Sequence, residues 1–383
     1  MEASTSRCLI PPCSFDDDQM SAALSDLCVT ADHSIRHVIA CIDRNEKGIV
    51  LVTDDQGHLI GTITDGDIRR TVLGRHSIDA PVKELLKRKE SSSSPYAQPV
   101  TALAGTDNAT LLKLMQEREI HQIPVLDEES RVVGLVTLDE LLPNQILPLQ
   151  AVIMAGGYGA RLRPLTEDVP KPMLPIGDRP LMELIIGQLR RTGIQRVNIA
   201  THYLPEKIKE YFGDGRDFGI ELSYVNEDRP LGTAGALGLM EPPENPLLII
   251  NGDILTRVNF KAMLDFHREN KAALTVAVRK YDMNVPYGVI ESEGASVRAL
   301  VEKPLLNFLV NAGIYLLEPA VHRYIPNNRH LNMTDLIQRL IDDGQMVASF
   351  PIMEYWLDIG NNVDYAQAQK DVKDGGLESE LDW

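Results

Sequence analysis

The stretch that decides the fold of most of this chain is Ala151–Pro172, AVIMAGGYGARLRPLTEDVPKP. Its apolar beginning, Ala151–Ala155, predicts a short buried strand. The strand runs directly into a loop that contains three glycines, Gly156, Gly157 and Gly159. Glycine accepts positive φ and lets backbone N–H groups come close to a bound anion, so the loop is suited to a polyphosphate.

Two fixed cations, Arg161 and Lys171, follow the glycines at short range. The residues between them include two stiffening prolines and a threonine, Pro164, Pro170 and Thr166. The run lacks the Gly-Lys-Ser/Thr ending of a P-loop, and Leu162 stands where a dinucleotide fingerprint needs its third glycine. The ordered combination therefore indicates a phosphate-binding loop of another class.

Strand-like and helical runs alternate from Leu149 onward, which predicts an α/β fold. The predicted strands are Arg196–Thr201, Glu221–Val225, Pro246–Ile250 and Leu274–Arg279. The predicted helices are Leu181–Thr192, Pro205–Phe212, Phe260–Asn270 and Asp335–Asp343. In open sheets of this class, ligands bind beyond the carboxyl ends of the strands. We therefore expect three further segments to carry the site, namely Asn226–Gly235, Leu248–Asp253 and Trp356–Gly360.

One aspartate has a suitable position for a metal ion, and a second aspartate is a further candidate. Asp253 ends the sequence Asn251-Gly252-Asp253 after a buried strand, and Asp358 lies in Trp356-Leu357-Asp358-Ile359-Gly360. Mg²⁺ prefers one or two carboxylates together with phosphates and water. A lone aspartate in a turn is more often a cap or a turn former, so the metal hypothesis depends on both.

The glycine loop with its two cations resembles the signature of the sugar-1-phosphate nucleotidyltransferases, and the resemblance continues through most of Leu149–Val372. It implies a Rossmann-like mixed sheet flanked by helices. It also implies a Mg²⁺-dependent reaction in which a sugar 1-phosphate attacks the α-phosphate of a nucleoside triphosphate and pyrophosphate leaves. The resemblance makes Asp253 and Asp358 the Mg²⁺ ligands and gives catalytic roles to three cations, Arg161, Lys171 and Lys303.

The nucleobase is predicted from the run Glu-x-x-Pro-Leu-Gly-Thr-Ala-Gly, which resembles the guanylyltransferases. The resemblance places Gly232 and Thr233 under the base and ribose, and Glu227 at the base edge. A carboxylate only accepts hydrogen bonds. Guanine offers two adjacent donors, whereas uracil and thymine offer one donor between two carbonyls, which suits an amide better. We expect GTP, with UTP or dTTP as the alternative; otherwise Glu227 lies in solvent or contacts Arg229.

Sugar contacts are expected from three short runs of the resemblance. Gly288, Asn311 and Gly313 present main chain without bulk beside polar groups. Glu302 offers an acid for sugar hydroxyls and Lys303 an ammonium for the sugar phosphate, although the two are also compatible with a solvated surface pair. Which sugar is used stays open, with hexosamine or mannose 1-phosphate suggested by resemblance.

The expected chemistry needs no general base, because a sugar phosphate is largely dianionic at neutral pH. Catalysis then reduces to in-line positioning and charge stabilisation. Arg161 and the loop amides would hold the departing pyrophosphate, Lys171 would neutralise charge at the α-phosphate, and Lys303 would align the attacker. The alternatives are a non-catalytic nucleotide sensor and transfer to a phosphorylated alditol or lipid acceptor.

The first 148 residues contain a repeat with a shift of 73 residues. The shift lays Ile49–Asp54 over Gln122–Asp127, and the predicted amphipathic helix Ile35–Arg44 over Asn108–Glu117. A unit this small cannot bury its own apolar face, so two copies are expected to pack together. The order of elements and the Gly-x-x-Thr-x-x-acid ending resemble a tandem pair of CBS domains, an α+β regulatory module.

The ending of each repeat carries the expected CBS ligand residues, Thr64, Asp67 and Thr137. By resemblance, the acid accepts from ribose hydroxyls and the threonine contacts phosphate of an adenine nucleotide. Glu140 replaces the aspartate in the second repeat, which places the second site in doubt. The alternative is a pair of repeats that only dimerises.

Composition limits the partners. The formal charge of −17 argues against nucleic acid and anionic membranes. The start of the chain lacks a signal-peptide pattern and no apolar run has the length of a membrane span, so a cytoplasmic protein is expected. All four cysteines, Cys8, Cys13, Cys28 and Cys41, match no metal or redox spacing.

The predicted organisation has four parts. Residues 1–22 form a poorly ordered start, and residues 23–148 a CBS pair with repeats at about 23–80 and 95–148. The nucleotidyltransferase domain covers 149–375 and a tail 376–383. Glu90–Gln98 is predicted as a flexible loop and Pro143–Gln150 as the linker. Because CBS pairs commonly associate, a homo-oligomer is expected.

Overall fold

A computed structural model of the chain describes residues 26–74, 76–91, 98–142 and 146–373. The chain divides into two compact units, Met1–Pro143 and Asn144–Trp383, and each is described by itself. Three predicted segments lie outside the described residues: the poorly ordered start 1–22, the tail 376–383 and most of the Glu90–Gln98 loop. Within the described residues, Glu90 and Ser91 belong to a helix rather than to that loop.

The first unit contains two copies of one motif, as predicted. The first copy comprises β1 (Cys28–Thr30), α2 (Ile35–Asn45), β2 (Ile49–Thr53), β3 (Leu59–Thr64), α3 (Asp65–Leu73) and α4 (Val82–Ser91). The second comprises β4 (Ala102–Leu103), α5 (Asn108–Arg118), β5 (Gln122–Leu126), β6 (Val132–Thr137) and α6 (Leu138–Leu141). The shift of 73 residues carries α2, β2 and β3 onto the bounds of α5, β5 and β6. The two repeats therefore share one local structure.

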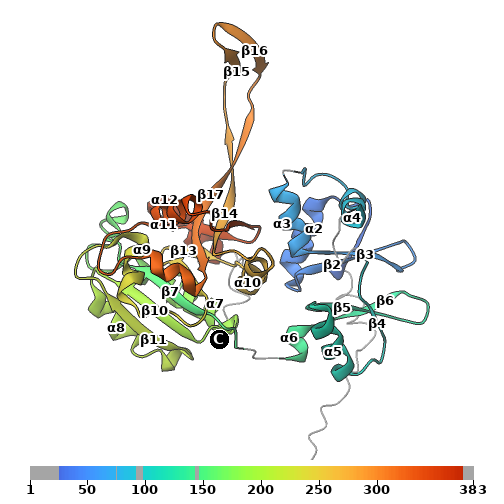
Figure 1. The fold of residues 1–383 in the computed structure, drawn as a ribbon, viewed down its shortest axis with the longest axis horizontal. Helices are drawn as coiled ribbons and strands as arrows, with labels where there is room; N and C mark the ends of the chain where they lie inside the picture. Colours follow the sequence, from blue (N-terminus) through green and yellow to red (C-terminus); the bar gives the residue numbers. More distant parts are fainter. Residues whose placement is uncertain (1–25, 75, 92–97, 143–145, 374–383) are drawn as a thin grey trace, which may run out of the picture. The chain divides into compact units, whose positions relative to one another are not determined.

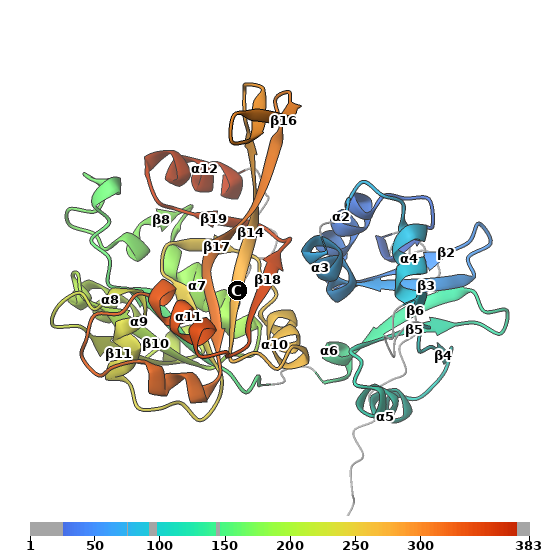
Figure 2. The same ribbon diagram turned by 45° about the horizontal axis from the view of Figure 1, so that its top comes forward.

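Matching side chains start the long helices of the two repeats. Ser34 caps α2 by accepting a hydrogen bond from His37 N at 3.2 Å, and Asp107 caps α5 by accepting from Thr110 N at 3.0 Å. The repeats form two sheets, β1-β2-β3 and β4-β5-β6, which Figure 2 shows side by side. The main chain joins them, since Val132 N donates to Gly57 O at 3.0 Å.

The second unit is built on a seven-stranded mixed sheet in the order β11-β10-β7-β12-β17-β14-β18. Its strands are β7 (Gln150–Ala155), β10 (Arg196–Thr201), β11 (Glu221–Asn226), β12 (Leu247–Asn251), β14 (Leu274–Asn284), β17 (Leu305–Leu317) and β18 (Val347–Ile352). All run parallel except β17, which is antiparallel to both β12 and β14. The predicted Rossmann-like mixed sheet is confirmed.

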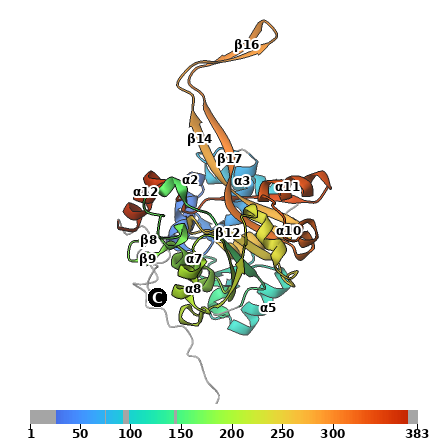
Figure 3. The same ribbon diagram turned by 90° about the vertical axis from the view of Figure 1, so that its left-hand side faces the viewer.

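Helices flank this sheet on both sides (Figure 3). The helices of the unit are α7 (Leu181–Arg191), α8 (Pro205–Phe212), α9 (Gly232–Gly235), α10 (Phe260–Glu269), α11 (Met333–Asp342) and α12 (Asn362–Lys373), of which α12 packs on the short strands β8 and β19. Asn259 caps α10 by accepting from Ala262 N, and Asn332 with Asp335 forms a capping box at α11. None of the helices in the described residues is long and apolar enough to cross a membrane.

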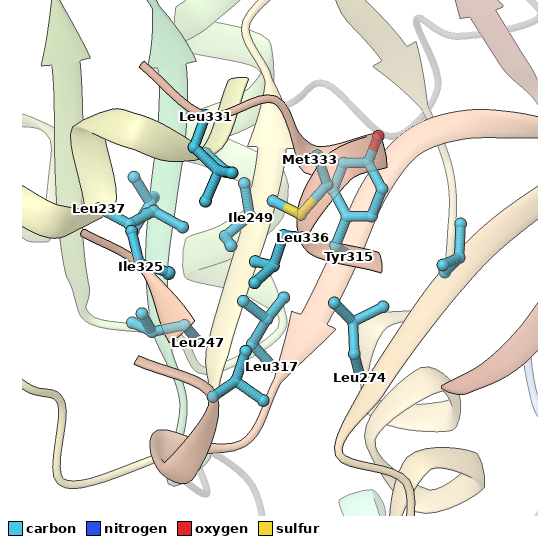
Figure 4. Close-up of a cluster of buried hydrophobic side chains, with 14 of the residues drawn as sticks. Leu237, Leu247, Ile249, Leu274, Tyr315, Leu317, Ile325, Leu331, Met333 and Leu336 are labelled. Atoms are coloured by element: carbon cyan, nitrogen blue, oxygen red, sulfur yellow. The ribbon is translucent and has the colours of Figure 1, made fainter. Parts of the chain in front are cut away.

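A buried apolar cluster fixes one face of the sheet. It joins strand residues such as Ile249, Leu274 and Leu317 to Leu336 of α11 (Figure 4). β7 and β12 are covered on both faces. Their sequences are therefore nearly continuous apolar runs and do not alternate between apolar and polar residues.

Three short pairs of strands complete the unit: β8 (Pro175–Ile176) with β9 (Arg179–Pro180), β13 (Ile254–Thr256) with β19 (Trp356–Asp358), and β15 (Val289–Glu293) with β16 (Ser296–Val301). The pair β15–β16 stands at the end of a ribbon that projects from the sheet (Figure 1).

Candidate active site

The glycine loop after β7 folds back onto Lys171. Gly159 has φ +62°, and a Cβ there would lie 2.9 Å from Thr166 Cγ2 and 3.2 Å from the Lys171 Cβ. Thr166, fully buried, donates from Oγ1 to Gly159 O at 2.8 Å. Only glycine fits this position, because the backbone is left-handed and the neighbouring side chains are close. Gly157, by contrast, faces open space with no atom within 4 Å of a Cβ position.

Lys171 and Asp253 form the central pair of the site. Lys171 Nζ lies 2.5 Å from Asp253 Oδ2, and Lys171 is only 9% exposed. The loop after β7 supplies the lysine, and the end of the adjacent strand β12 supplies the aspartate. The parallel pairing of β7 and β12 therefore brings two predicted site residues together at their carboxyl edge.

The second aspartate lies beside the first. β13 and β19 pair antiparallel with Ile254 opposite Asp358, and Ile359 N donates to Asp253 O at 3.0 Å. Partial burial raises the pKa of Asp358, and the charge of Asp253 raises it further, while Lys171 and Arg161 act to lower it. Arg161 Nη1 lies 3.7 Å from a Cβ position at Gly360, next to Asp358. Two carboxylates and two cations thus share one site.

The donor set at this position suits a divalent cation. Asp253 Oδ1 and Asn251 Oδ1 are buried side-chain oxygens without a hydrogen-bond partner in the part of the chain that the structure describes. Unpaired buried oxygens are rare and call for an explanation. No group of three or more His, Cys, Asp or Glu side chains in the described ranges has the arrangement of a metal site. Two carboxylates are nevertheless sufficient for Mg²⁺ when phosphates and water complete its shell.

Glu227 lies buried beside the glycine loop. Its Oε2 accepts a hydrogen bond from Leu231 N at 2.8 Å, and its Oε1 would lie 2.8 Å from a Cβ at Gly156. Burial raises the pKa of Glu227, whereas the Leu231 amide and His202 lower it. Glu227 does not lie in solvent, because it is only 8% exposed. Arg229, the other expected partner, instead donates to Asn328 O.

The sequence analysis missed two residues at this position. His202 Nδ1 lies 2.8 Å from Glu227 O, and its Nε2 lies 2.9 Å from the Tyr158 hydroxyl. His202 directly follows β10, so the rule that sites lie at carboxyl ends of strands could have identified it. The Tyr158–His202 contact joins the glycine loop to the segment that holds Glu227.

Gly232 and Thr233 begin α9, and both contact the start of α11. Thr233 Oγ1 accepts from Met333 N at 2.8 Å, and a Cβ at Gly232 would lie 2.7 Å from Asn332 Oδ1. These contacts give the two residues a packing role besides any contact with a nucleotide.

The predicted sugar residues divide into two groups. Gly313 and Asn311 lie at the site, because Gly313 N donates to Asn311 Oδ1 and a Cβ at Gly313 would lie 2.7 Å from Asn251 Nδ2. The structure does not bring Gly288, Glu302 and Lys303 to this group. Val278 pairs with Asn311, and the last pair of β14 with β17 is at Asn284. The six residues of extended strand between Val278 and Asn284 span roughly 20 Å. Gly288, Glu302 and Lys303 lie beyond that pair.

The endings of the CBS repeats are capping boxes. Thr64 caps α3 and Asp67 at N3 accepts from Thr64 N, while Thr137 and Glu140 do the same at α6. An aspartate and a glutamate both serve this purpose, which explains the difference between the repeats without a ligand.

The Asp67 carboxylate is already fully engaged within the unit. Its Oδ2 accepts from Lys89 Nζ at 2.8 Å and from the Thr64 hydroxyl at 3.0 Å, and its Oδ1 accepts from Arg70 at 2.8 Å. A ribose would have to displace one of these donors. A cavity of about 520 Å³ lies elsewhere between the repeats, lined by Leu59, Ile60, Glu90, Gln98, Pro99, Thr101, Leu126 and Ser130.

Comparison with known proteins agrees with this architecture. Residues 150–375 match the family model of the nucleotidyl transferases, and residues 23–74 and 94–144 match that of the CBS domain. The chain belongs to the nucleotidyl transferase family and carries a tandem pair of CBS domains.

Curated relatives use different nucleotides. The mannose-1-phosphate guanylyltransferase of Mycobacterium tuberculosis is 32% identical over 235 residues, which cover 59% of this chain and 65% of the relative. The UTP–glucose-1-phosphate uridylyltransferase of Synechocystis sp. is 31% identical over 245 residues, which cover 58% of this chain and 63% of the relative. The mannose-1-phosphate guanyltransferase of Candida albicans is 33% identical over 230 residues, which cover 57% of this chain and 62% of the relative. The matches thus span less than two thirds of each relative.

Proposed function

We propose that this chain is a sugar-1-phosphate nucleotidyltransferase, which makes a nucleotide sugar and pyrophosphate from a nucleoside triphosphate and a sugar 1-phosphate. The observation that carries the proposal is the joining of Lys171, Asp253, Asp358 and Arg161 at the carboxyl edge of the sheet, beside a glycine loop. This arrangement supplies cations for phosphates and carboxylates for a metal ion in one place.

The residues divide the work of positioning and charge stabilisation. The oxygen of the sugar phosphate attacks the α-phosphorus, the bond between the α- and β-phosphates breaks, and the electron pair leaves with pyrophosphate. Arg161 and the loop amides hold the leaving group, and Lys171 stabilises charge that develops at the α-phosphate. Asp253 and Asp358 would hold Mg²⁺, which supplies further charge neutralisation when bound.

Guanine is the base that we propose for the triphosphate. Glu227 is a buried acceptor beside the glycine loop, and an acceptor-only group matches the two adjacent donors of guanine. The relatives include enzymes named for GTP and for UTP, so the preference rests on this residue alone.

The CBS pair is proposed to regulate the enzyme by binding an adenine nucleotide. The cavity of about 520 Å³ between the repeats has the size of a small-molecule site. Calorimetry of the full-length chain with AMP, ADP and ATP tests this proposal. Absence of binding for all three would leave the pair a packing or dimerisation role.

Pyrophosphate release tests the enzymatic proposal. The full chain with Mg²⁺ is assayed over GTP, UTP, dTTP and ATP, each with mannose, glucose and glucosamine 1-phosphates and without any sugar phosphate. We expect release only when both substrates are present, and fastest with GTP. Release that does not depend on the sugar phosphate would indicate hydrolysis and overturn the assignment.

A further inference from the structure

The β-arm, defined as residues 279–310, projects from the second unit as a two-stranded ribbon (Figures 1 and 3). β14 and β17 remain paired from Arg279–Val310 to Asn284–Leu305, and β15 with β16 forms the end of the arm. The pairing of β14 with β18 stops at Arg279–Ile352, so beyond this point the described chain adds no third strand. The arm leaves the sheet beside the carboxyl end of β12, the edge that carries the candidate active site.

One face of the arm near its base is apolar. Tyr281 lies opposite Phe308, and Met283 lies opposite Leu306, so all four side chains share a face. The opposite face carries the pairs Lys280–Leu309 and Asp282–Asn307. Such alternation is the pattern of a ribbon with one buried side, yet the four apolar side chains are 36–56% exposed.

The arm holds an unusual share of the exposed apolar surface. Of the 20 large hydrophobic side chains exposed in the described residues, 11 lie between Tyr281 and Leu309. At ~100 Å² for each half-exposed large side chain they present on the order of 1,000 Å². The arm as a whole therefore has enough apolar surface for the ~800 Å² that each partner buries in a stable interface, and the four residues of the apolar face contribute about 400 Å² of it. A two-stranded ribbon is marginally stable alone in water, so a covering partner is expected.

A second copy of the chain is the partner that fits these observations. A four-residue apolar face is self-complementary about a two-fold axis, which is the symmetry of most homodimers. The arm also carries Glu302 and Lys303. While the β14–β17 ladder is intact, these two residues lie too far along the arm to reach the Lys171–Asp253 site of their own chain. The arm of a neighbouring copy would not have to break any of these strand pairs to approach that site.

We propose that two copies exchange their β-arms through the Tyr281–Phe308 and Met283–Leu306 face, and that each arm places Lys303 at the other copy's Lys171–Asp253 site. The interface depends only on the apolar face, whereas the placement of Lys303 rests on the proposed function. In this arrangement, Lys303 would bind the phosphate of the sugar substrate in trans. Each site is complete only in the dimer.

The interface is tested with the full-length chain by light scattering after gel filtration. Tyr281→Asp combined with Phe308→Asp should halve the mass of the assembly relative to the wild type. Val363→Asp, which changes a 77% exposed apolar residue on α12, serves as the matched control and should leave the mass unchanged. Circular dichroism checks that each variant keeps its secondary structure. A monomeric wild type, or an unchanged mass in the arm variant, would overturn the proposal.

Mixed dimers test whether Lys303 acts in trans. Lys303→Ala and Asp253→Asn should each lose at least tenfold in turnover. After both variants are unfolded, mixed and refolded together, random pairing makes half of the dimers mixed, and each of these has one intact site, so about a quarter of wild-type activity should return. No recovery beyond the sum of the separate variants would show that Lys303 serves its own chain or no site. A wild type that is dimeric but inactive with every substrate would refute the proposed function and leave the interface standing.

Discussion

Lys171 Nζ lies 2.5 Å from Asp253 Oδ2, although 82 residues separate the two in the chain. The contact arises because β7 and β12 are adjacent parallel strands and each residue follows the end of its strand. Lys171 occupies one carboxylate oxygen of Asp253, and the other, Oδ1, is buried without a hydrogen-bond partner in the described residues. Under the proposed function, this second oxygen would bind the cation and the Lys171 ammonium would contact the phosphates.

Substitution of this pair should reduce turnover while the fold is retained. Asp253→Asn and Lys171→Met should each lower kcat by about 10²–10³, the scale for loss of one charged group that stabilises the transition state. Lys370→Met, an exposed residue of α12, is the control and should have normal activity. Steady-state pyrophosphate release measures the effect. Normal turnover in both site variants would contradict the proposed roles.

The base preference should depend on Glu227. Glu227→Gln keeps an oxygen for the Leu231 amide but faces guanine with a donor, so the ratio of kcat/KM for GTP over UTP should fall by roughly 10–100-fold, or about 1–3 kcal/mol. Glu221→Gln changes an exposed residue of β11, the strand that ends just before Glu227, and should leave the ratio unchanged. An intact GTP preference in Glu227→Gln, or a wild type that prefers UTP, would refute guanine recognition by this residue.

The Asp67–Lys89 pair should stabilise the first unit. The side chains are 6% and 9% exposed, so Lys89→Met leaves a buried carboxylate without its main partner and should cost about 3–5 kcal/mol. Lys87→Met, exposed on the same helix, should cost little. Hydrogen exchange of α3 and α4 measures the loss. Equal protection in the two variants would show that the pair does not stabilise the unit.

The same pair has a defined pH dependence. Burial acts to raise the pKa of Asp67, but the charge and hydrogen bond of Lys89, with Thr64 and Arg70, bring it below its ordinary value of 3.8. Its stabilisation is therefore present above pH 3.8 and is lost as the pH falls through the lower pKa of the folded state. The stability difference between wild type and Lys89→Met should be largest at neutral pH and should shrink as Asp67 becomes protonated at acid pH. A difference that is equally large at pH 3 and at pH 7 would contradict this explanation.

The sequence predicted features that depend on local patterns. The loop after β7, the 73-residue repeat and the helix Pro205–Phe212 follow from glycine placement, periodicity and apolar spacing. The predicted strand at Leu274 was five residues too short, because its continuation to Asn284 has the alternating pattern of an exposed ribbon.

Contacts between distant segments could not be predicted in this way. The sequence pattern predicts that the carboxylate of Asp67 binds a ligand. The packing of α4 in the structure shows that its partner is Lys89. The separation of Lys303 from Asp253 depends on the register of β14 with β17, which no local pattern encodes. Both differences concern residues whose neighbours come from another element.

The product of the reaction tests the central claim most directly. The full-length chain is incubated with Mg²⁺, GTP and mannose 1-phosphate that carries ¹⁸O in its non-bridging phosphate oxygens, and in parallel with the other triphosphates and sugar phosphates. If the sugar phosphate attacks the α-phosphorus, mass spectrometry will show a nucleotide sugar that retains all the label, together with unlabelled pyrophosphate. Failure of every substrate pair to give a nucleotide sugar, or label in the pyrophosphate, would contradict the account.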